Sequence, residues 1–255
     1  MLKPDVIRFR VGFKWRSFLA QSPRIYSAWI GLRNPSHALG VNPITTDLVL
    51  EGFPRSGNTF AWYALMMAQI YPLNIAHNLH SPARVIHAAR NDVPTLVLIR
   101  EPKDCVISYC IYEPRLSLKL GFIYWLRFYK SIKPYSSKYV LATFNEVISD
   151  FGKVIKTVND RFDTQFMVFD HTTENVQRVA SSIEAKTHLL LKRSDSSYPI
   201  EDRLSVPSDL RARKKEALGS CIQKDENLLH LMNQAQSLYR SMVMKRDHRS
   251  GRQHL

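Results

Sequence analysis

The chain has 255 residues, of which 45% are apolar and 11% aromatic, and this is enough to bury a sizeable core. Its 36 Lys and Arg residues outnumber the 22 Asp and Glu residues, and the net charge of +14 favours anionic partners. This composition excludes a collagen, a coiled coil, a disulfide scaffold and a zinc finger, and its three cysteines indicate reduced thiols in a cytoplasmic protein. We expect neither a transmembrane helix nor a secretory signal.

The first segment of the chain is basic and rich in aromatic residues. Residues 1–33 carry seven basic residues against one acid, Asp5, and apolar and basic residues alternate from Ile7 to Trp15. Alternation is typical of a strand, but a helix would also gather four apolar residues on one face, namely Ile7, Val11, Trp15 and Phe18. Both alternatives stay open. We expect residues 1–45 to form an arm that packs on or flanks the domain and allows contact with an acidic membrane surface.

Strand-like and helical segments then alternate along the chain. Buried strands are predicted over residues 46–53, 95–99, 139–144 and 166–169. Helices are predicted over residues 59–71, 82–90, from 102 onward, 119–133, 146–162, 173–191 and 208–245. This order predicts an α/β fold: a single domain over 46–245 with a central, mainly parallel sheet flanked by helices, in a P-loop-like nucleotide-binding architecture. Residues 77–82 are predicted as a turn, 192–208 as a loop and 246–255 as a polar tail.

A glycine-bearing loop joins the first predicted strand to the following helix, with the sequence Gly-Phe-Pro-Arg-Ser-Gly-Asn-Thr over residues 52–59. In such a loop the backbone N–H groups converge and the helix dipole adds positive charge, so the loop is suited to an anion. The spacing approaches that of the triphosphatase P-loop, but Asn58 stands where that motif needs lysine. The cation here is Arg55, which suits a single phosphate.

A second basic element follows the next strand, at the end where open α/β sheets bind ligands. Arg100 ends that strand, and Ser108 lies about two turns into the helix that Pro102 begins. Together they are suited to bind a second phosphate. Asp104, in the first turn, is expected to compensate the helix dipole.

Both elements resemble the donor-binding motifs of the sulfotransferases. Residues 54–60, Pro-Arg-Ser-Gly-Asn-Thr-Phe, resemble the 5′-phosphosulfate loop of that family, whose common form is Pro-Lys-Ser-Gly-Thr-Thr-Trp. The segment from Arg100 to Ser108 resembles the 3′-phosphate motif, Arg-x-x-x-Asp-x-x-x-Ser, at the same spacing. The similarity at the level of motifs lies within residues 47–110.

The resemblance implies a sulfotransferase that takes 3′-phosphoadenosine 5′-phosphosulfate as donor, uses no metal, and transfers the sulfuryl group to a hydroxyl or amine. By this resemblance Arg55 contacts the leaving oxygen and is catalytic. The implied donor-binding residues are Arg55, Ser56, Gly57, Asn58, Thr59, Phe60 (in the position of the tryptophan that stacks on adenine), Arg100 and Ser108. The glycine-rich third motif of the family is not recognisable. The candidates for its positively charged residues are Arg193, Arg203, Arg211 and Arg213.

The transfer needs a base that takes the proton of the acceptor, and histidine is suited to this near neutral pH. His80-Ser81-Pro82 resembles the His-x-Pro segment that supplies the base in the family, so His80 is the first candidate and His77 the second. His87 falls in a predicted helix and is interpreted as structural. The acceptor is expected to be a small molecule, a glycan or a lipid with a hydroxyl. The candidates to line the acceptor pocket are the aromatic residues Tyr109, Tyr112, Phe122, Tyr124, Trp125, Phe128 and Tyr129.

Two alternative functions compete with this interpretation. A P-loop kinase or nucleoside triphosphatase would use Asp170, after the predicted strand 166–169, to hold magnesium, but it would lack the P-loop lysine. A non-catalytic module that binds nucleic acid or acidic lipid would use the basic clusters 211–215 and 245–252. A solvated helix face explains the first cluster more simply, and no nucleic-acid partner is expected. The sequence leaves the oligomeric state open.

Overall fold

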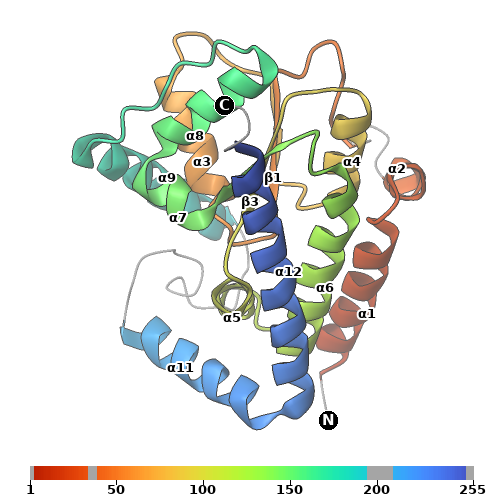
Figure 1. Cartoon of the computed structure of the whole chain (residues 1–255). Helices are drawn as coiled ribbons and strands as arrows, with labels where there is room; N and C mark the ends of the chain where they lie inside the picture. The colour runs from red at the N-terminus through yellow and green to blue at the C-terminus, as the bar shows by residue number, and fades with distance from the viewer. Residues whose placement is uncertain (1–2, 34–38, 194–208, 251–255) are drawn as a thin grey trace.

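The structure, a computed structural model, describes residues 3–33, 39–193 and 209–250. Its centre is a four-stranded parallel sheet in the order β2-β1-β3-β4 (Figure 1). The strands are β1 (Leu48–Gly52), β2 (Ile75–His77), β3 (Thr95–Ile99) and β4 (Val140–Thr143). The sheet confirms the predicted α/β class with a parallel sheet.

The strands are mostly apolar because both faces of the sheet are covered. In β3, Leu96 and Leu98 contribute to the buried cluster on one face, whereas Val97 and Ile99 contribute to the cluster on the other face. All four side chains are fully buried. Successive residues of a strand point to opposite faces, so a two-sided core needs apolar residues at every position.

Helices cover both faces, and Figure 1 shows the two layers on either side of the sheet. The first layer is α3 (Asn58–Ala68), α7 (Phe144–Ser149), α8 (Phe151–Phe162) and α9 (Thr173–Arg193). The second is α4 (Pro82–Arg90), α5 (Pro102–Tyr112), α6 (Leu118–Ile132) and α12 (Glu226–Ser250). A short 3-10 helix, Lys133–Tyr135, follows α6, and α11 (Asp209–Lys224) packs outside α5. No helix within the described ranges is both long and apolar enough to cross a membrane.

The N-terminal segment is helical, so the structure decides between the two alternatives that the sequence left open. It forms α1 (Pro4–Leu19) and α2 (Pro23–Arg33), and α1 packs against α6. The ring of Phe13 meets that of Tyr124 edge-on, with 5.0 Å between centroids. Arg10 Nε donates to the carbonyl of Arg115 at 2.8 Å and fastens the same face of α1.

Two of the predicted helices are each divided in two by an aspartate. The side chain of Asp150 accepts a hydrogen bond from the N–H of Lys153 and caps α8, so the predicted helix 146–162 becomes α7 and α8. Asp225 in the same way accepts bonds from the N–H groups of Asn227 and Leu228 and begins α12. The prediction of one last helix that ends near 245 was wrong, since α12 continues to Ser250.

The prediction of a strand over residues 166–169 was also wrong. Phe166 and Phe169 are buried in the core, but side chains take the backbone hydrogen bonds that a neighbouring strand would take. Asn159 bonds to both the N–H and the carbonyl of Phe166, and Gln69 does the same for Met167. The segment therefore fills the core without extending the sheet.

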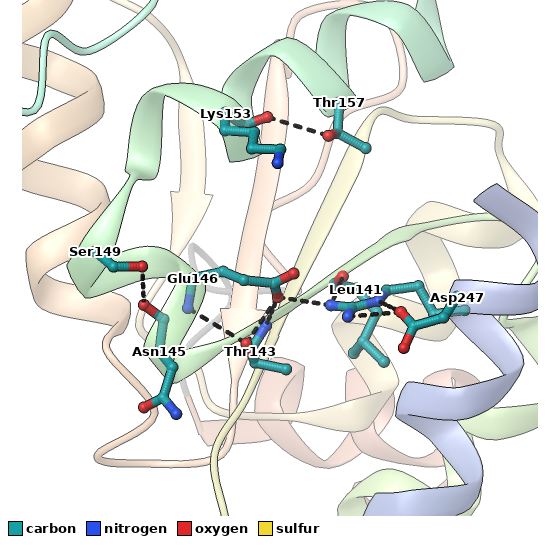
Figure 2. Close-up of polar contacts among 9 residues, drawn as sticks. Leu141, Thr143, Asn145, Glu146, Ser149, Lys153, Thr157 and Asp247 are labelled. Atoms are coloured by element: carbon teal, nitrogen blue, oxygen red, sulfur yellow. Dashed lines mark hydrogen bonds and ion pairs between the residues drawn. The ribbon is translucent and has the colours of Figure 1, made fainter. Parts of the chain in front are cut away.

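An ion pair fastens the C-terminal helix to the end of β4. Glu146 caps α7 by accepting the N–H of Thr143 at 2.7 Å, and Arg246 of α12 donates to the same carboxylate oxygen at 2.6 Å (Figure 2). Arg246 also donates to the carbonyl of Leu141 at 3.3 Å. Burial acts to raise the pKa of Glu146, but the bonds from Thr143 and the charge of Arg246 outweigh it, and the pKa is lowered.

Replacing Arg246 with alanine should lower the free energy of unfolding by about 1 kcal/mol, because its partly exposed ion pairs with Glu146 and Asp247 and one backbone bond are lost. A lowered carboxyl pKa stabilises the fold above the unfolded-state pKa, so the difference from wild type should shrink as pH falls below about 4.5. Urea unfolding at pH 7 and pH 4 measures this. The matched control is Lys245→Ala, at an exposed site on the same helix; an equal loss there would refute the specific role of Arg246.

Candidate functional site

The loop between β1 and α3 contains two residues with a left-handed backbone conformation. Arg55 and Gly57 have φ of 70° and 95°. A Cβ on Gly52 would lie 2.5 Å from the carbonyl oxygen of Leu98, so this position requires glycine. Asn58, which stands in the position of the P-loop lysine, is buried, and its Nδ2 donates to the carbonyl of Phe53 at 3.1 Å. The side chain of Asn58 therefore faces the interior of the loop and bonds to its backbone.

A buried polar network supports this loop from below. Ser56 is fully buried, and its Oγ lies 3.4 Å from Sγ of Cys105 and 3.5 Å from the hydroxyl of Tyr129. Burial raises the pKa of Cys105 to about 12, so the neutral thiol donates to the carbonyl of Pro54 at 3.2 Å. The Ser56 hydroxyl thus faces the core, whereas the side chain of Thr59 is exposed.

The two predicted basic elements lie side by side, because β1 and β3 are neighbours in the sheet. Arg100, directly after β3, donates from Nη1 to the backbone carbonyl of Arg55 at 3.2 Å. Arg55 in turn donates from Nε to Oγ of Ser108 on α5, also at 3.2 Å. The Arg100 guanidinium stacks 4.1 Å from the ring centroid of Phe144. The structure therefore brings Arg55, Arg100 and Ser108 together in one positively charged surface.

A third guanidinium belongs to the same surface. Burial, with the charges of Arg211 and Arg100 acting in the same direction, lowers the pKa of Arg55 to about 10, against the opposing influence of Tyr112 and Cys105. Arg211 is buried on α11. Among the four C-terminal candidates, Arg213 is exposed, and the side chains of Arg193 and Arg203 lie outside the described residues. Guanidinium groups that lie near one another can form charge-assisted hydrogen bonds with one anion, so this arrangement fits an anionic ligand.

Phe60, the candidate for stacking on adenine, packs against α8 and the segment that follows it. Its ring contacts those of Phe151, Phe169 and His171, with centroids 6.5, 6.3 and 5.9 Å away. Phe60 remains partly exposed. That Phe60 stacks on the adenine ring of the donor therefore stays a prediction.

The proposed base, His80, is held next to the first glycine of the loop. Its Nδ1 lies 2.9 Å from the carbonyl oxygen of Gly52. A carbonyl can only accept, so Nδ1 carries the proton and Nε2 is free to accept one. Burial lowers the pKa of His80 to about 4, and the charges of Arg16 and Arg84 act in the same direction. The ring is therefore neutral at pH 7.

His80 borders a small cavity between α1 and the loop. The cavity has a volume of about 50 Å³ and is lined by Phe13, Arg16, Ser17, Pro54, His80, Tyr109 and Tyr124. Two of these, Tyr109 and Tyr124, belong to the aromatic set that the sequence offered for an acceptor pocket. The hydroxyl of Tyr124 donates to the backbone carbonyl of His80, so the cavity wall and the histidine are connected.

A buried ion pair, which the sequence analysis missed, positions the His80 turn. Glu51 of β1 is fully buried and accepts hydrogen bonds from the N–H groups of Leu79 and His80, at 3.0 and 2.9 Å. Arg84 of α4 donates to Glu51 at 2.9 Å and to the carbonyl of His77 at 2.7 Å. Burial raises the pKa of Glu51 to about 7, although Arg84 and the two N–H groups act against it. The sequence signal that could have revealed this pair is a carboxylate inside a strand predicted to be buried.

The other two histidines do not line the cavity with His80. His77 ends the edge strand β2, and its ring stacks on Trp62 with 4.8 Å between centroids and 16° between planes. His87 lies in the last turn of α4, where burial and the charge of Arg90 lower its pKa. His80 is therefore the candidate histidine that lines this cavity, and its role as a base stays a prediction.

A larger groove of about 510 Å³ runs between α5 and α11. Its lining residues are Lys103, Asp104, Ile107, Lys215, Glu216, Gly219, Ser220, Gln223 and Lys224, which do not include Arg55 or Arg100. Asp104 is exposed in the first turn of α5, the position expected of a residue that compensates the helix dipole. Among the residues that the structure describes, no group of three His, Cys, Asp or Glu side chains is placed to hold a metal ion.

No protein-family model matches the chain, and no curated protein matches its sequence. Among solved structures, the chain is similar to the crystal structure of mouse sulfotransferase SULT7A1 complexed with PAP, with 15% sequence identity and a TM-score of 0.40. The similarity covers 77% of this chain and 90% of the mouse chain. A similarity at this TM-score carries no conclusion about what this chain binds.

Proposed function

We propose that the chain is a sulfotransferase that moves the sulfuryl group of 3′-phosphoadenosine 5′-phosphosulfate to an acceptor hydroxyl or amine. The observation that carries the proposal is the contact between the two motifs: Arg100 bonds to the backbone of Arg55, which bonds to Ser108. These residues lie after neighbouring parallel strands, where open α/β sheets bind nucleotides. A donor with phosphates at both ends of its ribose matches two adjacent cationic elements.

Each part of the donor has a candidate partner. The backbone of Ser56, Gly57 and Asn58 and the exposed Thr59 would hold the 5′-phosphate at the N-terminus of α3. The 3′-phosphate would bind Arg100 and Ser108, with Arg211 as the third cation, in the role of the family motif that is not recognisable in this sequence. Guanidinium groups form strong charge-assisted hydrogen bonds with phosphate, and this supports the assignment.

The chemistry is an in-line displacement at sulfur. The acceptor oxygen attacks sulfur while the bond between sulfur and the oxygen of the 5′-phosphate breaks, and the electron pair of that bond stays on the phosphate. The charge of Arg55 stabilises the departing phosphate. Nε2 of the neutral His80 takes the acceptor proton, and the Gly52 carbonyl keeps the ring in the required tautomer. The acceptor would enter from the cavity that Tyr109 and Tyr124 line.

Isothermal titration calorimetry tests the donor. Adenosine 3′,5′-bisphosphate, the desulfated product, should bind to the full chain more tightly than adenosine 5′-phosphate, and more tightly than ATP with magnesium. Arg100→Ala should remove the preference for the 3′-phosphate because its cation is lost. The matched control is Arg213→Ala, at an exposed site on α11, which should keep the preference. Tighter binding of ATP with magnesium would contradict the proposal and favour a kinase or triphosphatase.

The pH dependence of transfer tests the base. Because the pKa of His80 lies near 4, its base form predominates above that pH, and turnover should not fall between pH 7 and pH 5.5 through protonation of His80. Transfer rates at saturating donor, measured from pH 4.5 to pH 8, check this. In His80→Ala, turnover should fall by about 10²–10⁴ with little change in donor affinity. A loss confined to donor affinity would contradict the role as a base.

A further inference from the structure

The outward face of α1 carries a stripe of exposed apolar side chains. The exposed fractions are 49% for Ile7, 52% for Val11, 60% for Trp15 and 55% for Phe18. At 3.6 residues per turn, these four positions fall within about 80° of the helix circumference. We call these four residues the α1 stripe. It is an uninterrupted apolar face about three turns long.

The opposite face of the same helix already forms the contact with the domain. Phe9 and Phe13 pack against the core, and Ser17 is buried and accepts a hydrogen bond from Arg127 of α6 at 2.9 Å. Figure 1 shows α1 at the edge of the molecule, with α6 on its inner side. A helix with one face on a core normally presents polar residues on the other face, so the α1 stripe needs an apolar partner of its own.

The charges beside the stripe indicate which partner. Arg8 and Lys14 are exposed and, by their helical positions, flank the α1 stripe on its two sides; Lys3, which precedes α1, and Arg24, on α2, are exposed as well. Asp5 is the one acid in the described segment 3–33. Apolar and aromatic side chains between Lys and Arg residues characterise helices that lie in the plane of an anionic membrane surface. Tryptophan also prefers the interface between headgroups and acyl chains.

We propose that the α1 stripe docks on an anionic lipid bilayer, with Trp15 and Phe18 inserted at the level of the headgroups and Arg8 and Lys14 in contact with acidic lipid. The inner side of the same helix supplies Phe13 and two further residues to the wall of the cavity that His80 borders. Docking therefore brings this cavity within about one helix diameter, ~10 Å, of the membrane surface. The docking surface stands independently of the proposed transfer reaction.

Co-sedimentation of the full chain with vesicles tests the proposal. The chain should bind to vesicles of phosphatidylcholine mixed with phosphatidylserine, bind less to phosphatidylcholine alone, and dissociate as salt increases. Trp15→Glu should weaken binding by about tenfold or more, because a charge replaces an inserted ring. The matched control is Met244→Glu, on α12, where the exposed fraction is also 60%, and it should bind as wild type does.

The charge requirement is tested separately. Arg8→Glu with Lys14→Glu should reduce binding to phosphatidylserine vesicles, whereas Lys153→Glu with Lys156→Glu, exposed on α8, makes the same change in net charge and should have little effect. Equal losses in the two double variants would overturn the proposal in favour of net charge alone. A dimer in solution that Trp15→Glu dissociates, without any vesicle binding, would overturn it in favour of a second copy of the chain.

Discussion

Replacing Arg55 with alanine should lower sulfuryl transfer by about 10²–10³ without lowering the stability of the fold. The loss of activity follows from the position of this guanidinium, in the loop after β1 and in contact with Ser108. Its charge is already disfavoured by burial and by Arg211 and Arg100, which lower the pKa of Arg55. Removal of one of three neighbouring positive charges relieves repulsion, so the melting temperature should stay the same or rise.

Two further variants separate charge from shape. Arg55→Lys keeps the positive charge in a left-handed position that already accepts a long side chain, and should keep transfer within about tenfold of wild type. Arg213→Ala removes a cation from the exposed side of α11 and should change neither turnover nor stability. Steady-state transfer assays and thermal unfolding measure the two effects. If Arg55→Ala keeps its turnover, or loses activity and stability together, the catalytic assignment of Arg55 fails.

The parts of the site that were predictable are those in which the local sequence determines the structure. The short apolar run Thr95–Ile99 is followed by Arg100, Glu101 and the helix-starting Pro102, and it forms β3 with the predicted bounds. Parallel strands end at the same edge of the sheet, so the approach of Arg100 to Arg55 followed from the strand order. Helix α4 likewise has the predicted bounds, because Pro82 begins it and Arg90 lies in its last turn.

The parts that were missed depend on tertiary contacts. Strand β2 has three residues, which is too short to produce a recognisable hydrophobic pattern in the sequence. It lies at the edge of the sheet and pairs with β1 alone. Residues 166–169 looked like a strand because they are apolar, yet Asn159 and Gln69 take the backbone bonds that pairing requires. Arg211 could not be distinguished from three other arginines, because the fold of α11 against α5 decides which one approaches Arg55.

The Glu51–Arg84 pair should be the most sensitive point of the fold outside the apolar core. Arg84→Met leaves the fully buried carboxylate without its countercharge, and should lower the free energy of unfolding by about 3–5 kcal/mol. Arg90→Met, at an exposed position on the same helix, is the control and should change stability by less than about 1 kcal/mol.

The loss of stability in Arg84→Met should be larger at high pH than at low pH. The pKa of Glu51 in the fold, about 7, lies above its value in the unfolded chain. The neutral carboxyl therefore stabilises the fold at low pH, and this contribution is lost as pH rises through 7. In Arg84→Met the carboxyl would bind its proton still more tightly, so the deficit relative to wild type should be larger at pH 8 than at pH 5. Urea unfolding at the two pH values measures it, and equal deficits would mean that Glu51 is not the group left unpaired.

A double variant separates stability from the positioning of His80. Glu51→Leu in the Arg84→Met background removes the buried charge as well, and should recover part of the lost stability. It also removes the acceptor of the N–H groups of Leu79 and His80, so the turn that holds the ring beside Gly52 should loosen. The pKa of His80, followed by NMR, should then rise from about 4 toward the value of a solvated histidine. If stability recovers while the pKa of His80 stays low, other contacts such as the Tyr124 hydroxyl bond hold the base in place, and Glu51 is not its positioning residue.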